Sequence, residues 1–232
     1  MPMHPYNEKE SIPPDTRILI VGTAPPPRFD EPKKLRGDDF DFFYGSEDNC
    51  MWEYLEKIAE EIDHAKLFNR TEVLFDAKSK IKYTDTSDEC CEMARSFLQK
   101  HHLWMKDIFD EYERKTGGEH LAADDAIKDP ALSACTDFAS ALRDNTSIST
   151  LAFTSRKAAI WTMKRLTQQR LLPDDLLSEL VRGIQTQRER GEFWNGKILD
   201  RNIGFVLLPS PSGRMGCDAT NVPLYKKLLF SP

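Results

Sequence analysis

The sequence predicts an α/β fold in which helices cover both faces of a mostly parallel sheet. Two observations carry this prediction. Three short apolar runs, each ended by small or turn-forming residues, are typical of buried parallel strands: they lie at 17–22, 150–155 and 203–210. Segments with helical spacing lie between these runs, as crossover connections between parallel strands require.

Four segments have the spacing of helices. The first follows 46-SED-48, an acidic stretch suited to a helix N-terminus, and its apolar residues recur at Trp52, Leu55, Ala59 and Ile62. The others cover 88–100, 156–170 and about 173–190, where Pro173 lies near the helix start. Residues 69–89 alternate weakly and contain turn residues, which predicts a hairpin-like excursion.

A chain of 232 residues is long enough for one domain with a sizeable core. We expect a short polar lead-in at 1–16 and a single domain at 17–232. No stretch approaches the roughly 20 apolar residues needed to cross a bilayer. The N-terminal residues also lack the apolar core of a signal peptide. We therefore expect no membrane association and a cytoplasmic, nucleoid-associated location.

The five cysteines are scattered along the chain at Cys50, Cys90, Cys91, Cys135 and Cys217. They form no C-x-x-C pair and no ligand-like grouping with histidine, so neither a zinc site nor an iron–sulfur cluster is predicted. Their odd number and scatter favour reduced thiols.

The net charge of −6 is unevenly distributed. Residues 151–232 contain 13 Lys+Arg and 7 Asp+Glu, a charge of +6, and residues 1–150 contain 19 and 31, a charge of −12. The basic C-terminal portion could present a positive face to phosphates. Alternatively, its basic residues only solvate helices.

Three loops contain residue types suited to ligand recognition. The first strand ends in 22-GTAPPP-27, where glycine allows close backbone approach and prolines stiffen the chain. The second loop, 42-FFYGSEDNCMW-52, places three aromatic side chains before Asn49, whose amide can both donate and accept. The last strand ends in 207-LLPSPSGRM-215, a stiff polar loop with a cation beside an apolar side chain. Each loop taken alone is also compatible with a purely structural turn.

In this order, the loops resemble the uracil-DNA glycosylase superfamily, and most closely its hypoxanthine-DNA glycosylase branch. That branch carries G-S-x-P-G, then Y-Y-x-x-x-x-N-x-F-W, and late in the chain L-P-S-T-S-P. The counterparts here are 22-GTAPP-26, 43-FYGSEDNCMW-52 and 207-LLPSPSG-213. Weaker matches lie between them at 107-DIFDEYER-114, 124-DDAI-127, 136-TDF-138 and 150-TLAFTSRKA-158. The order agrees over about 17–230, with an insertion near 65–87.

The resemblance implies a three-layer α/β/α fold with a four-stranded, mostly parallel sheet. It places a strand at about 103–109, where the charge pattern alone suggests a helix. It implies a DNA glycosylase that flips out a deaminated base (hypoxanthine, uracil or xanthine) and hydrolyses its glycosidic bond. The expected partner is DNA containing a damaged or deaminated base. No cofactor is implied, and we expect a monomer.

The resemblance also implies roles for individual residues. Asn49 would orient the attacking water, with support from Asp48 or Glu47 unless these acids only cap the helix. Phe43 or Tyr44 would stack on the flipped base, and the backbone at Gly22, Thr23 and Ala24 would read its polar edge. Asp107 would recognise the base edge or stabilise the sugar cation. The last loop would bind DNA. Phosphates would be contacted by Ser210, Ser212 and Gly213, and the space left by the base would be filled by Arg214 and Met215.

Two positions depart from better-known branches of the superfamily. Ala24 stands where those branches carry an Asp, Asn or Glu that positions water, and Leu208 stands where uracil-specific enzymes carry His; the hypoxanthine branch shares both departures. These departures leave open a protein of the same fold that binds nucleic acid or a nucleotide without chemistry. A third alternative is an unrelated α/β enzyme for a phosphorylated small molecule, although neither a Walker-type nor a dinucleotide-type glycine pattern is present.

Overall fold

A five-stranded sheet forms the centre of the molecule, with strand order β4-β1-β5-β7-β6. The computed structural model describes residues 3–30, 34–75, 78–118, 124–129, 131–186, 190–212 and 217–230. The strands of the sheet are β1 (Ile18–Gly22), β4 (Leu103–Asp107), β5 (Thr150–Phe153), β6 (Gly191–Ile198) and β7 (Arg201–Leu207). The first four in the strand order run parallel, and β6 pairs antiparallel with β7.

The predicted α/β class is confirmed, and so is the strand near 103–109. The predicted number of four strands is wrong, because β6 adds a fifth strand to the sheet. Two features hid β6. It lies at the edge of the sheet and is mostly part-exposed or exposed, so its sequence GEFWNGKI lacks the apolar run of a buried strand. Its tight turn to β7 uses Leu199 and Asp200 at φ 51° and 59°, instead of the Asn-Gly pair that usually signals such a turn.

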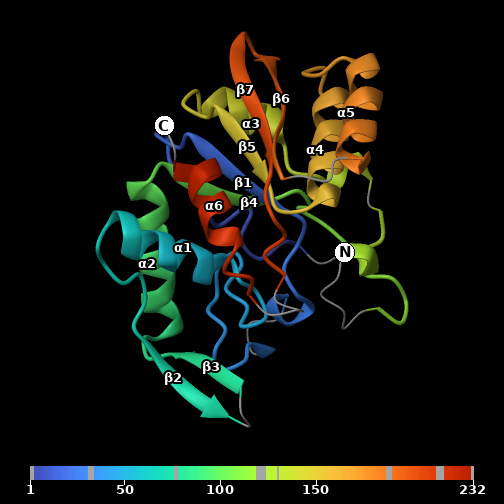
Figure 1. Cartoon of the computed structure of the whole chain (residues 1–232). Coiled ribbons are helices and arrows are strands. Elements are labelled where there is room, and N and C mark those ends of the chain that lie inside the picture. The colour runs from blue at the N-terminus through green and yellow to red at the C-terminus, as the bar shows by residue number, and fades with distance from the viewer. Residues whose placement is uncertain are drawn as a thin grey trace.

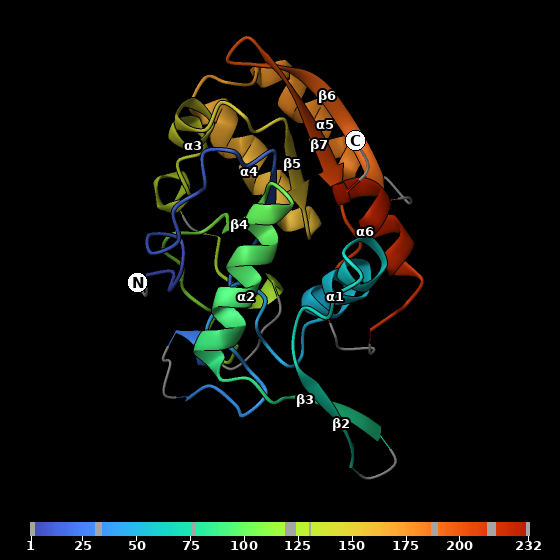
Figure 2. The same ribbon diagram turned by 90° about the vertical axis from the view of Figure 1, so that its left-hand side faces the viewer.

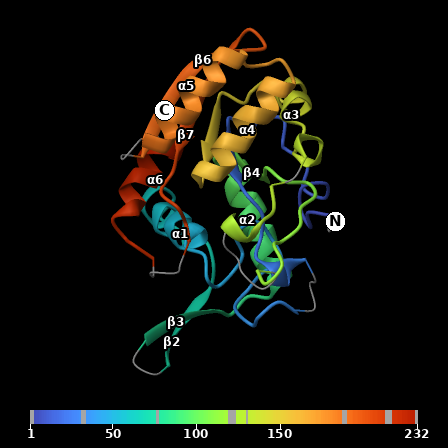
Figure 3. The same ribbon diagram turned by 90° about the vertical axis from the view of Figure 1, so that its right-hand side faces the viewer.

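Helices cover both faces of this sheet, which makes three layers (Figure 1). One layer holds α1 (Met51–Ile62), α2 (Ser87–Lys100) and α6 (Asn221–Phe230), and the other holds α3 (Phe138–Asp144), α4 (Arg156–Gln168) and α5 (Asp174–Thr186). The two side views show these groups on opposite sides of the strands (Figures 2 and 3). None of the described helices is long and apolar enough to cross a membrane.

The predicted hairpin-like excursion is the pair β2 (Arg70–Phe75) and β3 (Lys78–Tyr83), which are antiparallel and extend away from the three layers (Figure 2). Short 3-10 helices lie in the connections: η1 (Pro27–Phe29), η3 (Asp124–Ala126) and η4 (Leu132–Ala134). The helix predicted from Pro173 to about Arg190 is α5, which ends at Thr186, and Arg190 instead leads into β6.

A cluster of aromatic side chains anchors the turn that precedes α1. Phe40, Phe42 and Trp52 are buried. The centroid of the Trp52 ring lies 5.7 Å from that of Phe40 and 6.1 Å from that of Phe42. The Trp52 indole N–H donates to the carbonyl of Phe43 at 2.8 Å, so the helix and the turn are held to each other. Gly45 is required here because a Cβ would lie 2.1 Å from the Phe40 carbonyl oxygen. The core thereby fixes the position of the chain from Phe42 to Asn49.

Candidate functional site

The carboxyl ends of the four parallel strands lie at one edge of the sheet, where α/β proteins place their ligand sites. A cavity of about 340 Å³ opens at this edge. Its lining includes many of the residues predicted from sequence: Thr23, Ala24, Phe43, Tyr44, Asp48, Asn49, Asp107, Ser210 and Ser212. The structure thus brings the three loops together. The predicted residues Gly213, Arg214 and Met215 lie outside the described part of the chain.

Gly22 lies beneath the cavity where two polar side chains converge. A Cβ built at this position would lie 2.1 Å from both Asp107 Oδ1 and the Tyr44 hydroxyl oxygen. Only glycine leaves room for those two atoms at the end of β1. The glycine predicted to allow close approach therefore admits side-chain atoms of the site itself.

Tyr44 and Phe43 differ in how they could meet a ligand. Phe43 is 1% exposed and its ring stacks on His4, with centroids 5.7 Å apart and planes at 26°. Tyr44 is less buried, has a left-handed backbone with φ 57°, and hydrogen-bonds through its hydroxyl to Thr154 Oγ1 at 3.0 Å. Burial raises the pKa of the Tyr44 hydroxyl well above its ordinary value, and the charge of Asp107 acts in the same direction. The hydroxyl therefore stays protonated at neutral pH.

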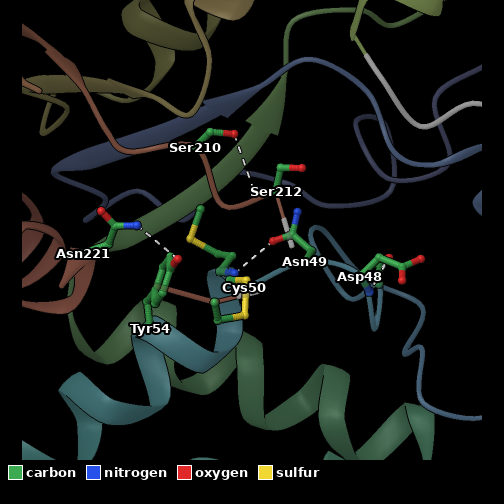
Figure 4. Close-up of a disulfide and its surroundings, with 10 residues drawn as sticks. Asp48, Asn49, Cys50, Tyr54, Ser210, Ser212 and Asn221 are labelled. Carbon is green, nitrogen blue, oxygen red and sulfur yellow. Dashed lines mark hydrogen bonds between the residues drawn. A yellow bond between two sulfur atoms is a disulfide. The ribbon is translucent and has the colours of Figure 1, made fainter. Parts of the chain in front are cut away.

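Asn49 joins the second loop to the last one. Its Oδ1 accepts from the Met51 N–H at 2.9 Å, and its backbone forms a β-bridge with Ser212 (Figure 4). The next residue, Cys50, donates its N–H to the Pro211 carbonyl at 2.7 Å. A carbonyl oxygen has a second lone pair, so Asn49 retains capacity for a water or a base edge while it also supports the helix start.

The two acids before Asn49 form ion pairs. Arg36 Nη1 lies 2.8 Å from Glu47 Oε1 and 3.1 Å from Asp48 Oδ2, and Arg28 Nη2 lies 3.2 Å from the same Asp48 oxygen. The alternative that these acids cap the helix is wrong. Helix α1 begins at Met51, its N-cap residue is Cys50, and no side-chain capping hydrogen bond is present there. Paired with arginines, the acids supply little uncompensated negative charge to the cavity.

Asp107, at the carboxyl end of β4, is 5% exposed and is enclosed by the N-terminal segment. Its Oδ2 lies 2.8 Å from His4 Nε2. The Asp107 backbone N–H donates to Asn7 Oδ1 at 3.0 Å, and the Asn7 side-chain amide donates through Nδ2 to the Asp107 carbonyl oxygen at 2.8 Å. Sequence reasoning missed His4 and Asn7, since both lie in the segment expected to be a lead-in and about 100 residues before their partner.

Asp124 is a further acid that lines the cavity, and the sequence assigned it no role. It lies at the start of η3, inside the 124-DDAI-127 match that could have drawn attention to it. Thr23 Oγ1 donates to its Oδ2 at 3.0 Å, and the same hydroxyl lies 3.0 Å from Ser155 Oγ. Burial raises the pKa of the Asp124 carboxyl, although the Thr23 and Ser155 hydroxyls partly oppose this. The cavity therefore contains a carboxyl beside Ala24, the position that lacks one.

A disulfide between Cys50 and Cys217 fastens the last loop, with Cα atoms 5.4 Å apart (Figure 4). The expectation of reduced thiols is wrong for this pair. The cysteines are 167 residues apart, and pairing over that separation follows from the meeting of α1 and the last loop, which spacing alone does not reveal. Ser212 pairs with Asn49 and Cys217 with Cys50, so these two residues of the last loop are both attached to the dipeptide Asn49–Cys50.

Loss of this disulfide is expected to lower the free energy of unfolding by about 2–4 kcal/mol, because the bond restricts a long loop in the unfolded chain. Urea unfolding of the wild type with and without dithiothreitol measures the effect. The Cys217→Ser protein should unfold at the lower midpoint in both conditions, which excludes an effect of reductant on the remaining cysteines. A wild-type midpoint that does not change on reduction would contradict the assignment.

In the described parts of the chain, no group of three or more His, Cys, Asp or Glu side chains could hold a metal ion. No protein-family profile and no curated protein matches the chain. Among solved structures, the chain is similar to the solution NMR structure of a "putative Uracil DNA glycosylase" from Methanosarcina acetivorans. The two are 14% identical with a TM-score of 0.49, over 94% of this chain and 91% of that chain.

Proposed function

We propose that this protein is a DNA glycosylase that excises a deaminated base from DNA. The observation that carries the proposal is the cavity at the carboxyl edge of the sheet, which the buried Asp107, the part-buried Asp124 and the amide of Asn49 line together. Its volume of about 340 Å³ is near the lower limit for small-molecule sites, a size that suits a single flipped nucleotide. The order of the loop motifs supports the hypoxanthine-DNA glycosylase branch within this class.

The reaction is the hydrolysis of one N-glycosidic bond. The bond between C1′ and the base nitrogen breaks with its electron pair going to the base, which takes up a proton. Water adds its oxygen to C1′ and gives up that proton, so the products are the free base and an abasic sugar. The transition state has cationic character on the sugar, and negative charge held close to it lowers the barrier.

The acids of the cavity suit this chemistry. Asp124 lies beside the first loop through its Thr23 contact, and in the proposal its carboxylate takes the place of the side chain absent at Ala24. Asn49 orients the water with the amide atoms that Met51 does not occupy. Tyr44 forms the wall against which the base stacks, and the backbone of Thr23 and Ala24 meets its polar edge.

The last loop supplies the contacts to DNA. Ser210 and Ser212 are exposed at the cavity, where their hydroxyls can donate to phosphate oxygens. Tyr225 donates its hydroxyl to the Pro209 carbonyl at 2.7 Å, so the start of the loop is fixed from behind. Because Pro209, Pro211 and Ser212 are each held by a contact, this part of the loop loses little conformational entropy when it binds DNA. In the proposal, Arg214 and Met215 fill the space that the base leaves.

The proposal is tested with a panel of oligonucleotides, each of which contains one hypoxanthine, uracil or xanthine. After incubation with the protein, alkali cleaves the strand at any abasic site that has formed. We expect excision of at least one of these bases in single turnover. Asn49→Ala should reduce the rate, and Ser140→Ala, on α3 and outside the cavity lining, serves as a control with wild-type rate. Equal rates for wild type and Asn49→Ala would remove Asn49 from the mechanism.

A second candidate function is binding of nucleic acid or a nucleotide without chemistry. The observation that favours it is the engagement of Asn49 Oδ1 by the Met51 N–H, together with an alanine at position 24. This candidate predicts salt-dependent DNA affinity, since phosphate contacts release counterions. It also predicts no abasic product from any oligonucleotide of the panel.

A further inference from the structure

The imidazole of His4 has its hydrogen-bonding roles fixed by its surroundings. Its Nδ1 accepts two backbone N–H groups, those of Tyr6 and Asn7, each at 3.1 Å. An imidazole nitrogen that accepts cannot carry a proton, so the ring proton is on Nε2. Nε2 therefore donates to Asp107 Oδ2 at 2.8 Å. His4 is therefore held in a single orientation, with Nδ1 toward the two backbone N–H groups and Nε2 toward Asp107.

Asp107 consequently faces the cavity as an acceptor. Its Oδ2 receives the His4 proton, and its backbone N–H and carbonyl are both bound by Asn7. Its Oδ1 has no hydrogen-bond partner among the described residues and lies at the cavity floor, close to Gly22. A carboxylate that already receives a donor on one oxygen can offer only lone pairs on the other.

The segment that contains His4 is firmly attached. His4 donates its N–H to the Asp110 carbonyl at 2.7 Å, and Met3 forms a β-bridge with Glu111. The buried Lys106 ammonium donates to the Glu10 carbonyl at 2.6 Å and to that of Asn7. These contacts hold the segment against the end of β4, so His4 keeps one position relative to Asp107.

We infer that His4 is a positioning residue of the base pocket, which holds Asp107 as an acceptor-only carboxylate and so selects a base whose edge donates a ring N–H. This inference rests on the proposed function and names the chemistry of its substrate. Deamination of adenine or cytosine replaces a ring nitrogen that accepts with a lactam N–H that donates. A carboxylate facing the pocket favours the second pattern and opposes a bare nitrogen lone pair.

The same contacts predict the outcome of changing Asp107. In Asp107→Asn, the His4 Nε2–H still requires an acceptor, so the amide turns its oxygen to His4 and its NH₂ group to the cavity. The group facing the base then changes from acceptor to donor. The base preference should therefore reverse, which an amide free to turn either way would not produce.

Free hypoxanthine and purine are the probes, because they differ in this property: hypoxanthine has N1–H, and purine has a bare N1 and no amino group. NMR titration gives the ratio of their dissociation constants within each protein variant. We expect the wild type to bind hypoxanthine about tenfold or more tightly than purine, since an unpaired buried acceptor is costly. In Asp107→Asn the order should reverse.

Two substitutions of His4 separate positioning from packing. His4→Phe keeps a ring against Phe43 but removes the donor to Asp107, and the ratio should fall toward one. His4→Gln keeps a side-chain N–H near the position of Nε2 and should restore most of the wild-type preference. A wild-type ratio in folded His4→Phe, or a hypoxanthine preference in Asp107→Asn, would overturn the inference, and the second variant leaves His4 and its packing intact.

Excision and binding separate the two claims. If the wild type shows the binding preference and its reversal but excises no base, the role of His4 stands and the proposed enzyme activity fails. If it excises a base equally well from hypoxanthine and purine nucleotides, the activity stands and the inference about His4 fails. A folded wild type that binds neither base overturns the inference.

Discussion

Asp124→Asn is expected to reduce single-turnover base excision by about 10²- to 10⁴-fold, the usual contribution of a positioned acid or base. Asp124 is the carboxyl that hydrogen-bonds to the first loop, and its partner Thr23 precedes Ala24 directly. Asparagine has nearly the same shape and can still accept from Thr23, but it has no negative charge for the sugar cation. Asp144→Asn is the matched control, because Asp144 is exposed at the end of α3, is not part of the cavity lining and should have a much smaller effect.

The pH dependence of the same variant provides an independent check. Burial raises the pKa of Asp124, and the negative charge of Asp107 raises it further. Excision requires the ionised form, so the wild-type rate should increase with pH through a limb above the ordinary aspartate value of about 3.9. The Asp124→Asn protein should lack that limb. A wild-type rate, or an unchanged limb, in this variant would exclude Asp124 from catalysis.

The raised pKa of Asp124 also determines how the stability of the protein changes with pH. The folded state binds this proton more tightly than the unfolded state, so the stabilisation is complete below the ordinary pKa and is lost as pH rises through the raised value. The wild type should therefore lose stability relative to Asp124→Asn as pH rises from about 4. Urea unfolding of both proteins across that range measures the difference.

Most of the fold could be predicted from the sequence, because local sequence patterns determine its main strands and helices. Three buried strands between helices appear as apolar runs, since parallel strands covered on both faces have no polar side. The motifs then located the cavity, because strand ends in a parallel sheet meet at one edge. The strand at 103–109 was recovered only through the resemblance, because Lys106 and Asp107, though buried here, gave that segment a polar pattern.

The parts that sequence reasoning missed depend on contacts between distant residues. His4 meets Asp107 across 103 positions, and the cysteine pair spans 167. No local pattern encodes either contact, because both arise when surfaces of finished elements meet. The exposed edge strand β6 was missed for the opposite reason, since its residues bury little and so show no apolar run.

Asp39→Asn is expected to lower the free energy of unfolding by about 1–3 kcal/mol, because it replaces a buried carboxylate by an amide and leaves a donor of Arg28 unpaired, while Arg28 keeps its ion pair with Asp48. The Asp39 side chain is 0% exposed, and Arg28 donates to both its oxygens, at 2.6 and 2.8 Å. The same carboxylate accepts the N–H groups of Arg36 and Glu47, at 2.9 and 2.8 Å. Asp39 thus ties the segment before Tyr44 to the segment before Asn49.

The effect should depend on pH in a defined direction. Burial alone would raise the pKa of Asp39, but the Arg28 guanidinium and the two N–H groups hold it below its ordinary value. A depressed pKa gives stability that is present above about 3.9 and lost as pH falls through the folded value. The difference between wild type and Asp39→Asn in urea unfolding should therefore be full at neutral pH and shrink in acid.

Glu47→Gln is the control for Asp39→Asn. Glu47 pairs with Arg36, whose side chain is 54% exposed, and such pairs contribute about 0–1 kcal/mol. The Glu47 N–H that Asp39 accepts is unchanged in this variant, so any larger loss at Asp39 reflects the buried carboxylate itself. If the two variants lost equal stability, the loop that holds Tyr44 and Asn49 would depend on its aromatic packing, and Asp39 would not be its anchor.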